Sequence, residues 1–199
     1  MSTNTTSKPF LHLLEGQGGM FEWSRLKADD NGELLHYIGT QGLITCVAVF
    51  FRVDEERFFM AHINALMQRS GVTSRNVTIE EGARVKEAVL ERLEADAKAN
   101  GWKRDALMIS KSIIIACPKM RNPYDDNENT GLYVVDALIE FLNLGLSREE
   151  LINKDCVGFI VGQDVEVQFI PDGGKRPDEY EERVLTDASN SNWTVGFTC

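Results

Sequence analysis

The residues from Leu43 to Val53 constrain the fold most, because they form a long and almost uninterrupted apolar segment. A strand that is apolar on both faces is typical of burial on both sides of a sheet. The acidic segment Asp54–Glu56 predicts a turn, and the segment Arg57–Ile63 predicts a partner strand that returns beside the first. This hairpin places Cys46 and His62 at the same end of a strand pair, because the turn lies near the midpoint between them.

Strands and helices are both expected along the rest of the chain. Further strands are predicted at residues 20–26, 34–39, 106–117, 156–161, 165–170 and 193–197. One helix is predicted after the capping box at 78–81, with its end at 100–101, and another at 132–144. Residues 1–9 are expected to be a disordered tail, and residues 10–199 to form a single domain. The mixture predicts an α+β fold, a mixed β-sandwich packed between α-helices.

Length and charge exclude several functional classes. The chain has 199 residues and a net charge of −10, and its 43% hydrophobic content is ordinary for one large domain. The 21 lysines and arginines are scattered and outnumbered by 31 acidic residues, so we expect no nucleic-acid or membrane partner. No apolar run approaches the roughly 20 residues of a membrane helix. The sequence leaves the oligomeric state open.

The cysteines point to a reducing compartment. Cys46, Cys117, Cys156 and Cys199 are widely spaced and form no CxxC motif. The first residues lack the basic start and apolar core of a secretory signal. We therefore expect reduced thiols without disulfides and a cytoplasmic location.

Cys46 and His62 together suggest nucleophilic chemistry. Alone, a cysteine in an apolar strand is typically an inert core residue, and a single histidine is typically a structural one. As a pair they are the minimum set for attack on a carbonyl, because the imidazole takes the thiol proton or pairs with the thiolate.

The residues around this pair resemble a known family. Residues 40–49 read TQGLITCVAV and residues 60–63 read MAHI. They resemble the T-x-G-x-G-S-C-V-A-V strand and the following A-H-hydrophobic step of the chemoreceptor glutamine deamidase family (CheD). Weaker similarity continues at residues 133–137 (YVVDA), 155–158 (DCVG) and 165–169 (VEVQF), which resemble a helix start and two strands of that family.

The resemblance implies a Cys46–His62–Thr40 triad, with Cys46 as nucleophile, His62 as base and Thr40 orienting His62. It implies a cysteine-dependent glutamine deamidase that acts on a carboxamide of a protein or a small molecule without a cofactor. Two departures stand out: Ile44 replaces a family glycine, and residues 64–66 replace its usual Leu-Pro ending.

Two other functions stay open. One is a catalytically inactive scaffold or interaction protein that retains the fold, because the bulk of Ile44 would reshape the pocket. The other is nucleoside chemistry of the YfiH-like purine nucleoside phosphorylases, which share this architecture with the cytotoxic necrotizing factor-type toxins. It ranks last, because such sites draw on several histidines and this chain has three in all.

No metal site is expected. Residues 125–136 imitate a calcium loop, but Thr130 stands where the loop requires glycine, and Asp136 replaces the usual glutamate. His12 and His36 have no cysteine or acidic cluster at ligand spacing.

Overall fold

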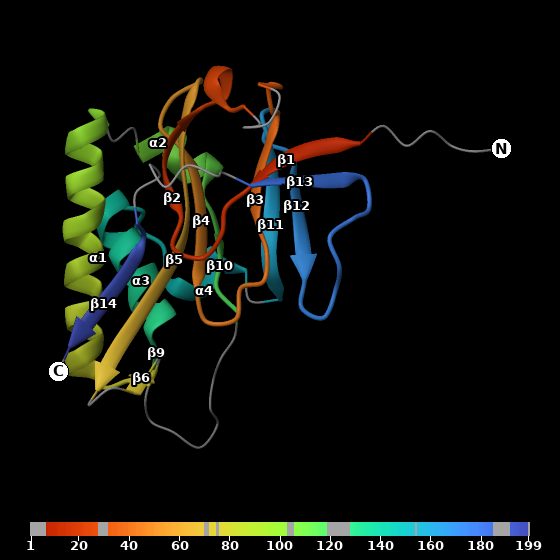
Figure 1. Ribbon diagram of the computed structural model, residues 1–199. Helices are drawn as coiled ribbons and strands as arrows, with labels where there is room; N and C mark the ends of the chain where they lie inside the picture. The colour runs from red at the N-terminus through yellow and green to blue at the C-terminus, as the bar shows by residue number, and fades with distance from the viewer. Residues whose placement is uncertain are drawn as a thin grey trace.

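Two mixed sheets face each other, and helices cover the outer side of one of them (Figure 1). The computed structural model describes residues 7–27, 32–69, 72–74, 76–102, 106–118, 128–153, 155–184 and 192–198. The α+β class predicted from the sequence is confirmed.

The first sheet has the strand order β12-β11-β3-β1-β13. Its strands are β1 (Lys8–His12), β3 (Tyr37–Thr40), β11 (Cys156–Gly162), β12 (Val167–Pro171) and β13 (Tyr180–Val184). Strand β1 runs parallel to β3 and β13, whereas β11 runs antiparallel to β3 and β12. The end of β3, where Thr40 lies, is therefore held between β1 and β11.

The second sheet has the main strand order β10-β8-β4-β5-β14. Its strands are β4 (Val47–Arg52), β5 (Arg57–Arg69), β8 (Ile114–Ala116), β10 (Ile152–Asn153) and β14 (Thr194–Thr198). Strands β2 (Gly18–Glu22) and β6 (Val72–Ser74) also pair with β5. A 3-10 turn (Trp23–Arg25) follows β2, and β7 (Asn76–Val77) pairs with β9 (Glu128–Asn129). The predicted β4–β5 hairpin is confirmed, with every residue from Val47 to Phe51 fully buried.

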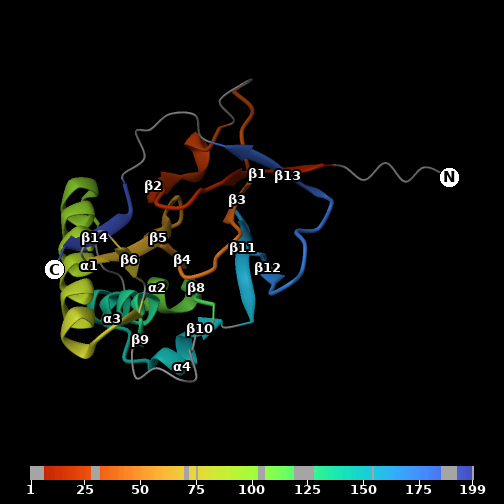
Figure 2. The same cartoon turned by 60° about the horizontal axis from the view of Figure 1, so that its bottom comes forward.

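The helices begin and end largely where the sequence indicates. Helix α1 (Ile79–Asn100) begins with the Thr78–Glu81 capping box and ends at Gly101, whose φ of 61° is left-handed. Helix α3 (Thr130–Leu142) lies beside it (Figure 2). A Cβ on Gly82 of α1 would lie 2.0 Å from the Tyr133 ring of α3, so glycine permits this close packing. Two short helices, α2 (Ala106–Ser112) and α4 (Arg148–Leu151), complete the set in the described residues.

Two hydrophobic clusters separate the layers. Side chains from α1, α3 and the outer face of β4 and β5 form the larger cluster. Side chains from the facing surfaces of the two sheets form the other, which we call the inter-sheet core. Cys46 belongs to the inter-sheet core, so the candidate nucleophile lies between the sheets and not against the helices.

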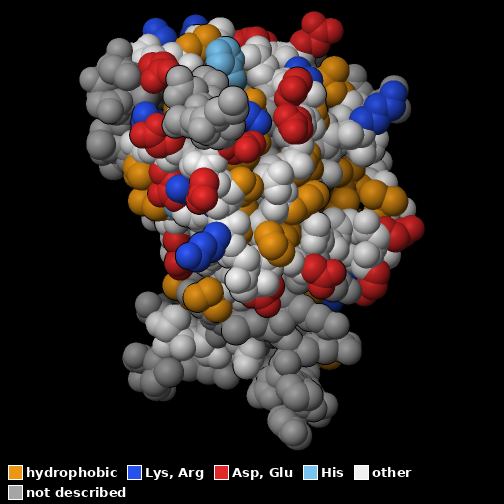
Figure 3. Space-filling view, turned by 90° about the vertical axis from the view of Figure 1, so that its right-hand side faces the viewer, with side chains coloured by type: hydrophobic (Ala, Val, Ile, Leu, Met, Phe, Trp, Pro, Cys, Tyr) orange, Lys and Arg blue, Asp and Glu red, His pale blue; other side chains and the backbone are white. Residues whose placement is uncertain are grey.

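The far face of the first sheet carries a smaller apolar cluster and no helix from the described part of the chain. Phe10, Ile160, Ile170 and Tyr180 are buried there, and the Arg176 guanidinium lies 5.4 Å from the centre of the Phe10 ring. Figure 3 views this side, where hydrophobic side chains lie among charged ones. The sequence placed the sandwich between helices, but the described helices all belong to the side of the second sheet.

Three expectations need correction. Residues 106–117 were expected to form one strand, but α2 occupies the first part and only Ile114–Ala116 is extended. The expected tail of residues 1–9 ends earlier, because Lys8 and Pro9 pair with Tyr180 and Glu181 of β13. Residues 1–6 lie outside the described residues. Strand β13 was not predicted at all.

None of the helices in the described residues is both long and apolar enough to cross a membrane.

Candidate functional site

The β4–β5 register brings Cys46 and His62 to one face of the second sheet. Ala48 of β4 is paired with His62 of β5, and Val47 with Ile63. Cys46 lies directly before β4, two residues from Ala48. Because side chains alternate along a strand, Cys46 and Ala48 lie on the same face of the sheet. Cys46 and His62 are therefore diagonal neighbours on adjacent strands, a separation within reach of an aromatic ring such as imidazole. Both are 3% exposed.

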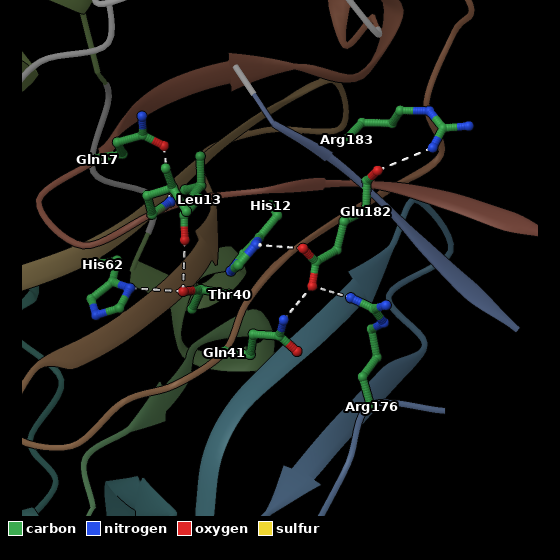
Figure 4. A network of polar contacts seen from close by, with 10 residues as sticks. His12, Leu13, Gln17, Thr40, Gln41, His62, Arg176, Glu182 and Arg183 are labelled. Carbon is green, nitrogen blue, oxygen red and sulfur yellow. Dashed lines mark hydrogen bonds and ion pairs between the residues drawn. The ribbon is translucent and has the colours of Figure 1, made fainter. Parts of the chain in front are cut away.

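Thr40 reaches the same face from the opposite sheet. It is the last residue of β3 and is fully buried. Its hydroxyl Oγ1 lies 2.8 Å from Nδ1 of His62 and 2.8 Å from the carbonyl oxygen of Leu13 (Figure 4). The structure thus brings all three predicted triad residues into the space between the two sheets.

The two hydrogen bonds of Thr40 determine the tautomer of His62. The Thr40 hydroxyl has a single proton, which it donates to the Leu13 carbonyl. The hydroxyl must therefore accept from His62, so Nδ1 of the neutral imidazole carries the proton. Nε2 is then the basic nitrogen of His62, and its lone pair is the one that takes a proton from an acid.

Asn64 lies beside the thiol, and the sequence did not single it out as a site residue. It follows Ile63 in β5 and stands across from Cys46, one position beyond the Val47–Ile63 pair. The Cys46 thiol donates to Asn64 Oδ1 over 3.7 Å. On its other side, Asn64 Nδ2 donates to the exposed carboxylate of Glu15.

Little in the sequence points to Asn64 and Glu15 as site residues. Asn64 marks a departure from the resembled motif, so it is visible in the sequence as an anomaly. Glu15 lies in the segment between β1 and β2, and only the fold brings it beside β5.

The loop between β3 and β4 presents Cys46 while pointing Ile44 outward. Gly42 has a φ of 74°, a left-handed conformation that favours glycine, and the backbone N–H of buried Leu43 donates to the Val157 carbonyl. The Ile44 side chain is 66% exposed. The side chain of Ile44 therefore lies at the surface. It does not enter the space between the sheets, where the sequence suggested that its bulk would reshape the pocket.

A second polar network lies on the other face of the first sheet. Thr40 points inward, and the next residue, Gln41, donates to the Glu182 carboxylate of β13 (Figure 4). Glu182 also pairs with Arg176, and its Oε2 lies 3.4 Å from Nδ1 of His12. Burial lowers the pKa of His12 below its ordinary value of 6.5, although the Glu182 carboxylate acts in the other direction. His12 is therefore neutral at pH 7.

The remaining candidates do not gather into a site. His36 Nδ1 lies 3.1 Å from Gln163 Oε1, and Asp136 forms an ion pair with Arg148. Residues 125–127 of the calcium-like segment lie outside the described residues. Within the described ranges, no three His, Cys, Asp or Glu side chains form a group able to hold a metal ion. Cys117 and Cys156 are buried, and neither is in a disulfide with Cys46; Cys199 is outside the described residues.

Two surface hollows in the described part of the chain lie away from Thr40, Cys46 and His62. One of about 330 Å³ is lined by residues of β2 and the turn after it, with Arg57 and Asn100. Another of about 410 Å³ lies beside α4 and β10. Neither is lined by Thr40, Cys46 or His62.

Comparison with known proteins gives no family for this chain. No family model matches it, and no curated protein matches its sequence.

Proposed function

We propose that this protein is a cysteine-dependent amidohydrolase that deamidates a primary carboxamide, in the manner of the protein glutamine deamidases. Cys46 is the nucleophile, His62 the base and Thr40 the positioning residue. The observation that carries the proposal is the pair of hydrogen bonds at Thr40. They orient the imidazole and leave Nε2 as its basic nitrogen, on the face of the sheet that also carries Cys46.

The chemistry follows from these groups. Nε2 of His62 takes the proton of the Cys46 thiol, and the thiolate attacks the carboxamide carbon. The tetrahedral intermediate collapses when the imidazolium protonates the nitrogen, which leaves as ammonia and gives a thioester. Water, deprotonated by the same imidazole, then attacks the thioester, so that a carboxylate forms and the thiol is regenerated.

Burial limits the substrate. Because Cys46 is 3% exposed, we expect the substrate to be a carboxamide at the end of a flexible side chain or on a small molecule, and not a main-chain amide of a folded protein. The net charge of −10 favours a basic or neutral substrate over a polyanion. Cys46, Cys117 and Cys156 are reduced thiols, as is usual in a reducing compartment, and we propose the cytoplasm.

The decisive test compares the wild type with Cys46→Ala. Each is incubated with cell extract, and peptide mass spectrometry then scores Gln-to-Glu and Asn-to-Asp conversion while released ammonia is assayed. We expect conversion with wild type and none with Cys46→Ala. Cys156→Ala is the matched control, because it removes a buried thiol of β11 and should leave conversion intact. Equal conversion with wild type and Cys46→Ala contradicts the proposal.

A non-catalytic scaffold is the second candidate, and the burial of Cys46 is the observation that favours it. The two candidates differ in what His62 does to the thiol. In the enzyme, His62→Ala slows the labelling of Cys46 by a small electrophile, because the base is lost. In the scaffold, labelling of Cys46, followed peptide by peptide, is the same with and without His62.

A further inference from the structure

The orientation of the Asn64 amide has a direct consequence for the charge of Cys46. A carboxylate only accepts hydrogen bonds, so the amide turns its NH₂ group, Nδ2, toward Glu15. Its oxygen, Oδ1, then faces Sγ of Cys46 at 3.7 Å. An amide oxygen also only accepts, so this contact is favourable when the sulfur carries a proton and unfavourable when it is a thiolate.

We propose that Glu15 and Asn64 form a latch that holds Cys46 as the neutral thiol. Glu15 fixes which way the amide faces, and the amide in turn stabilises the S–H form. When Glu15 does not fix it, the amide turns over, and Nδ2 donates to the sulfur and stabilises the thiolate instead. Glu15 and Asn64 are thus positioning residues that act through Cys46.

The side-chain amide of Asn64 can rotate without disturbing strand β5. The backbone N–H of Asn64 donates to the Trp193 carbonyl, a contact that does not depend on the side chain. Asn64 is 5% exposed, so little water competes for its amide, whereas Glu15 is exposed and open to solvent and partners. The fold therefore joins a surface carboxylate to a buried thiol through one side chain.

Glu15→Gln is the sharpest variant, because it replaces a carboxylate that only accepts hydrogen bonds with an amide of nearly the same size. A glutamine accepts from Nδ2 or donates to Oδ1 equally well, so the Asn64 amide is no longer fixed. The thiolate should then form at lower pH, by about the fivefold change in equilibrium that one net hydrogen bond corresponds to.

The measurement is a pH titration of thiolate absorbance in the ultraviolet on the full chain. In each background the spectrum of the matching Cys46→Ser variant is subtracted, so that Cys46 alone is reported. Circular dichroism at each pH confirms that the folded protein is compared. Glu87→Gln, which removes one exposed charge from α1, is the matched control and should leave the midpoint unchanged.

Ionic strength separates the latch from a simple charge effect. An exposed carboxylate that acts through space is screened by salt, whereas the orientation of a buried amide is not. We expect the shift in Glu15→Gln to persist at high salt and to vanish when Asn64→Ala is added, as in a double-mutant cycle. A midpoint that Glu15→Gln leaves unchanged overturns the latch, and so does a shift that salt abolishes or that persists when Asn64→Ala is added.

The inference rests on the proposed function only in taking Cys46 as the reactive atom. The titration requires no turnover, so an absent deamidation leaves its result standing. Conversely, deamidation with no shift in Glu15→Gln retains the enzyme and removes the latch.

Discussion

Substitutions of Thr40 test whether activity requires the orientation of His62 and not only its presence. Thr40→Val keeps the shape of the side chain but removes both hydrogen bonds of Oγ1. The imidazole then loses the partner that selects its tautomer, so we expect kcat to fall at least about tenfold. The free energy of unfolding should fall by about 1–3 kcal/mol, because the buried Leu13 carbonyl loses its donor. Deamidation rates and urea unfolding of the purified variant measure the two effects.

Thr40→Ser provides the control for this prediction. It retains a hydroxyl that donates to Leu13 and accepts from His62, so it should recover most of kcat even if packing is weakened. A purely structural role for Thr40 predicts instead that activity follows stability in both variants. Full activity in Thr40→Val would contradict the orienting role.

At the scale of elements, Gly158 of β11 sets how closely the strand approaches the end of β3. A Cβ at this position would lie 2.2 Å from the carbonyl oxygen of Thr40 and 2.6 Å from Cα of Gln41. Because both atoms are backbone, Gly158→Ala must displace the end of β3 that carries Thr40. We expect a loss of about 1–3 kcal/mol in the free energy of unfolding, together with reduced kcat.

Gly196→Ala is the matched control, because Gly196 lies in β14 with nothing within 4 Å of an added Cβ. The same substitution there should change stability by less than about 0.5 kcal/mol and leave kcat unchanged. Equal effects of the two variants in urea unfolding would show that the close approach at Gly158 does not matter.

The elements that the sequence predicted well are those with strong local signals. The β4–β5 hairpin and α1 follow from apolar continuity and a capping box, and both are present. Helix α2 was missed because the apolar run at 106–117 is too short for periodicity to distinguish helix from strand. Strand β13 was missed because its sequence, YEERV, is charged, as an edge strand tolerates.

The residues of the candidate site also differ in how much local sequence signal they have. Thr40, Cys46 and His62 were singled out in the sequence because the motif that resembles the deamidase family is local to one hairpin and the segment before it. Glu15 was not found, because only the folding of the β1–β2 segment against β5 brings its carboxylate to Asn64. Contacts that depend on tertiary packing leave no period or spacing in the sequence.

At the scale of the whole molecule, His12 couples stability to pH through the first sheet. It is 7% exposed on β1, facing Glu182 of β13 and near Arg176. Burial lowers its pKa below 6.5, with Glu182 opposing that effect and Arg176 adding to it. As the pH falls below about 6.5, the unfolded chain therefore binds a proton that the folded protein binds only at lower pH. The contribution of His12 to the free energy of unfolding is therefore full above about pH 6.5 and decreases as the pH falls below that value.

We expect His12→Gln to flatten this dependence. The free energy of unfolding of the wild type should decline from about pH 6.5 downward, whereas the variant should lose stability only nearer the carboxylate range. Glu181, whose hydrogen bond from Arg183 lowers its pKa below 4.5, belongs to that lower range, so the two effects are separable. Urea unfolding at a series of pH values measures the free energy of unfolding of the wild type and of His12→Gln. The difference between the two proteins above pH 7 gives the part that is due to packing and does not depend on pH. Parallel curves between pH 6.5 and the carboxylate range would show that another group, and not His12, carries the proton linkage.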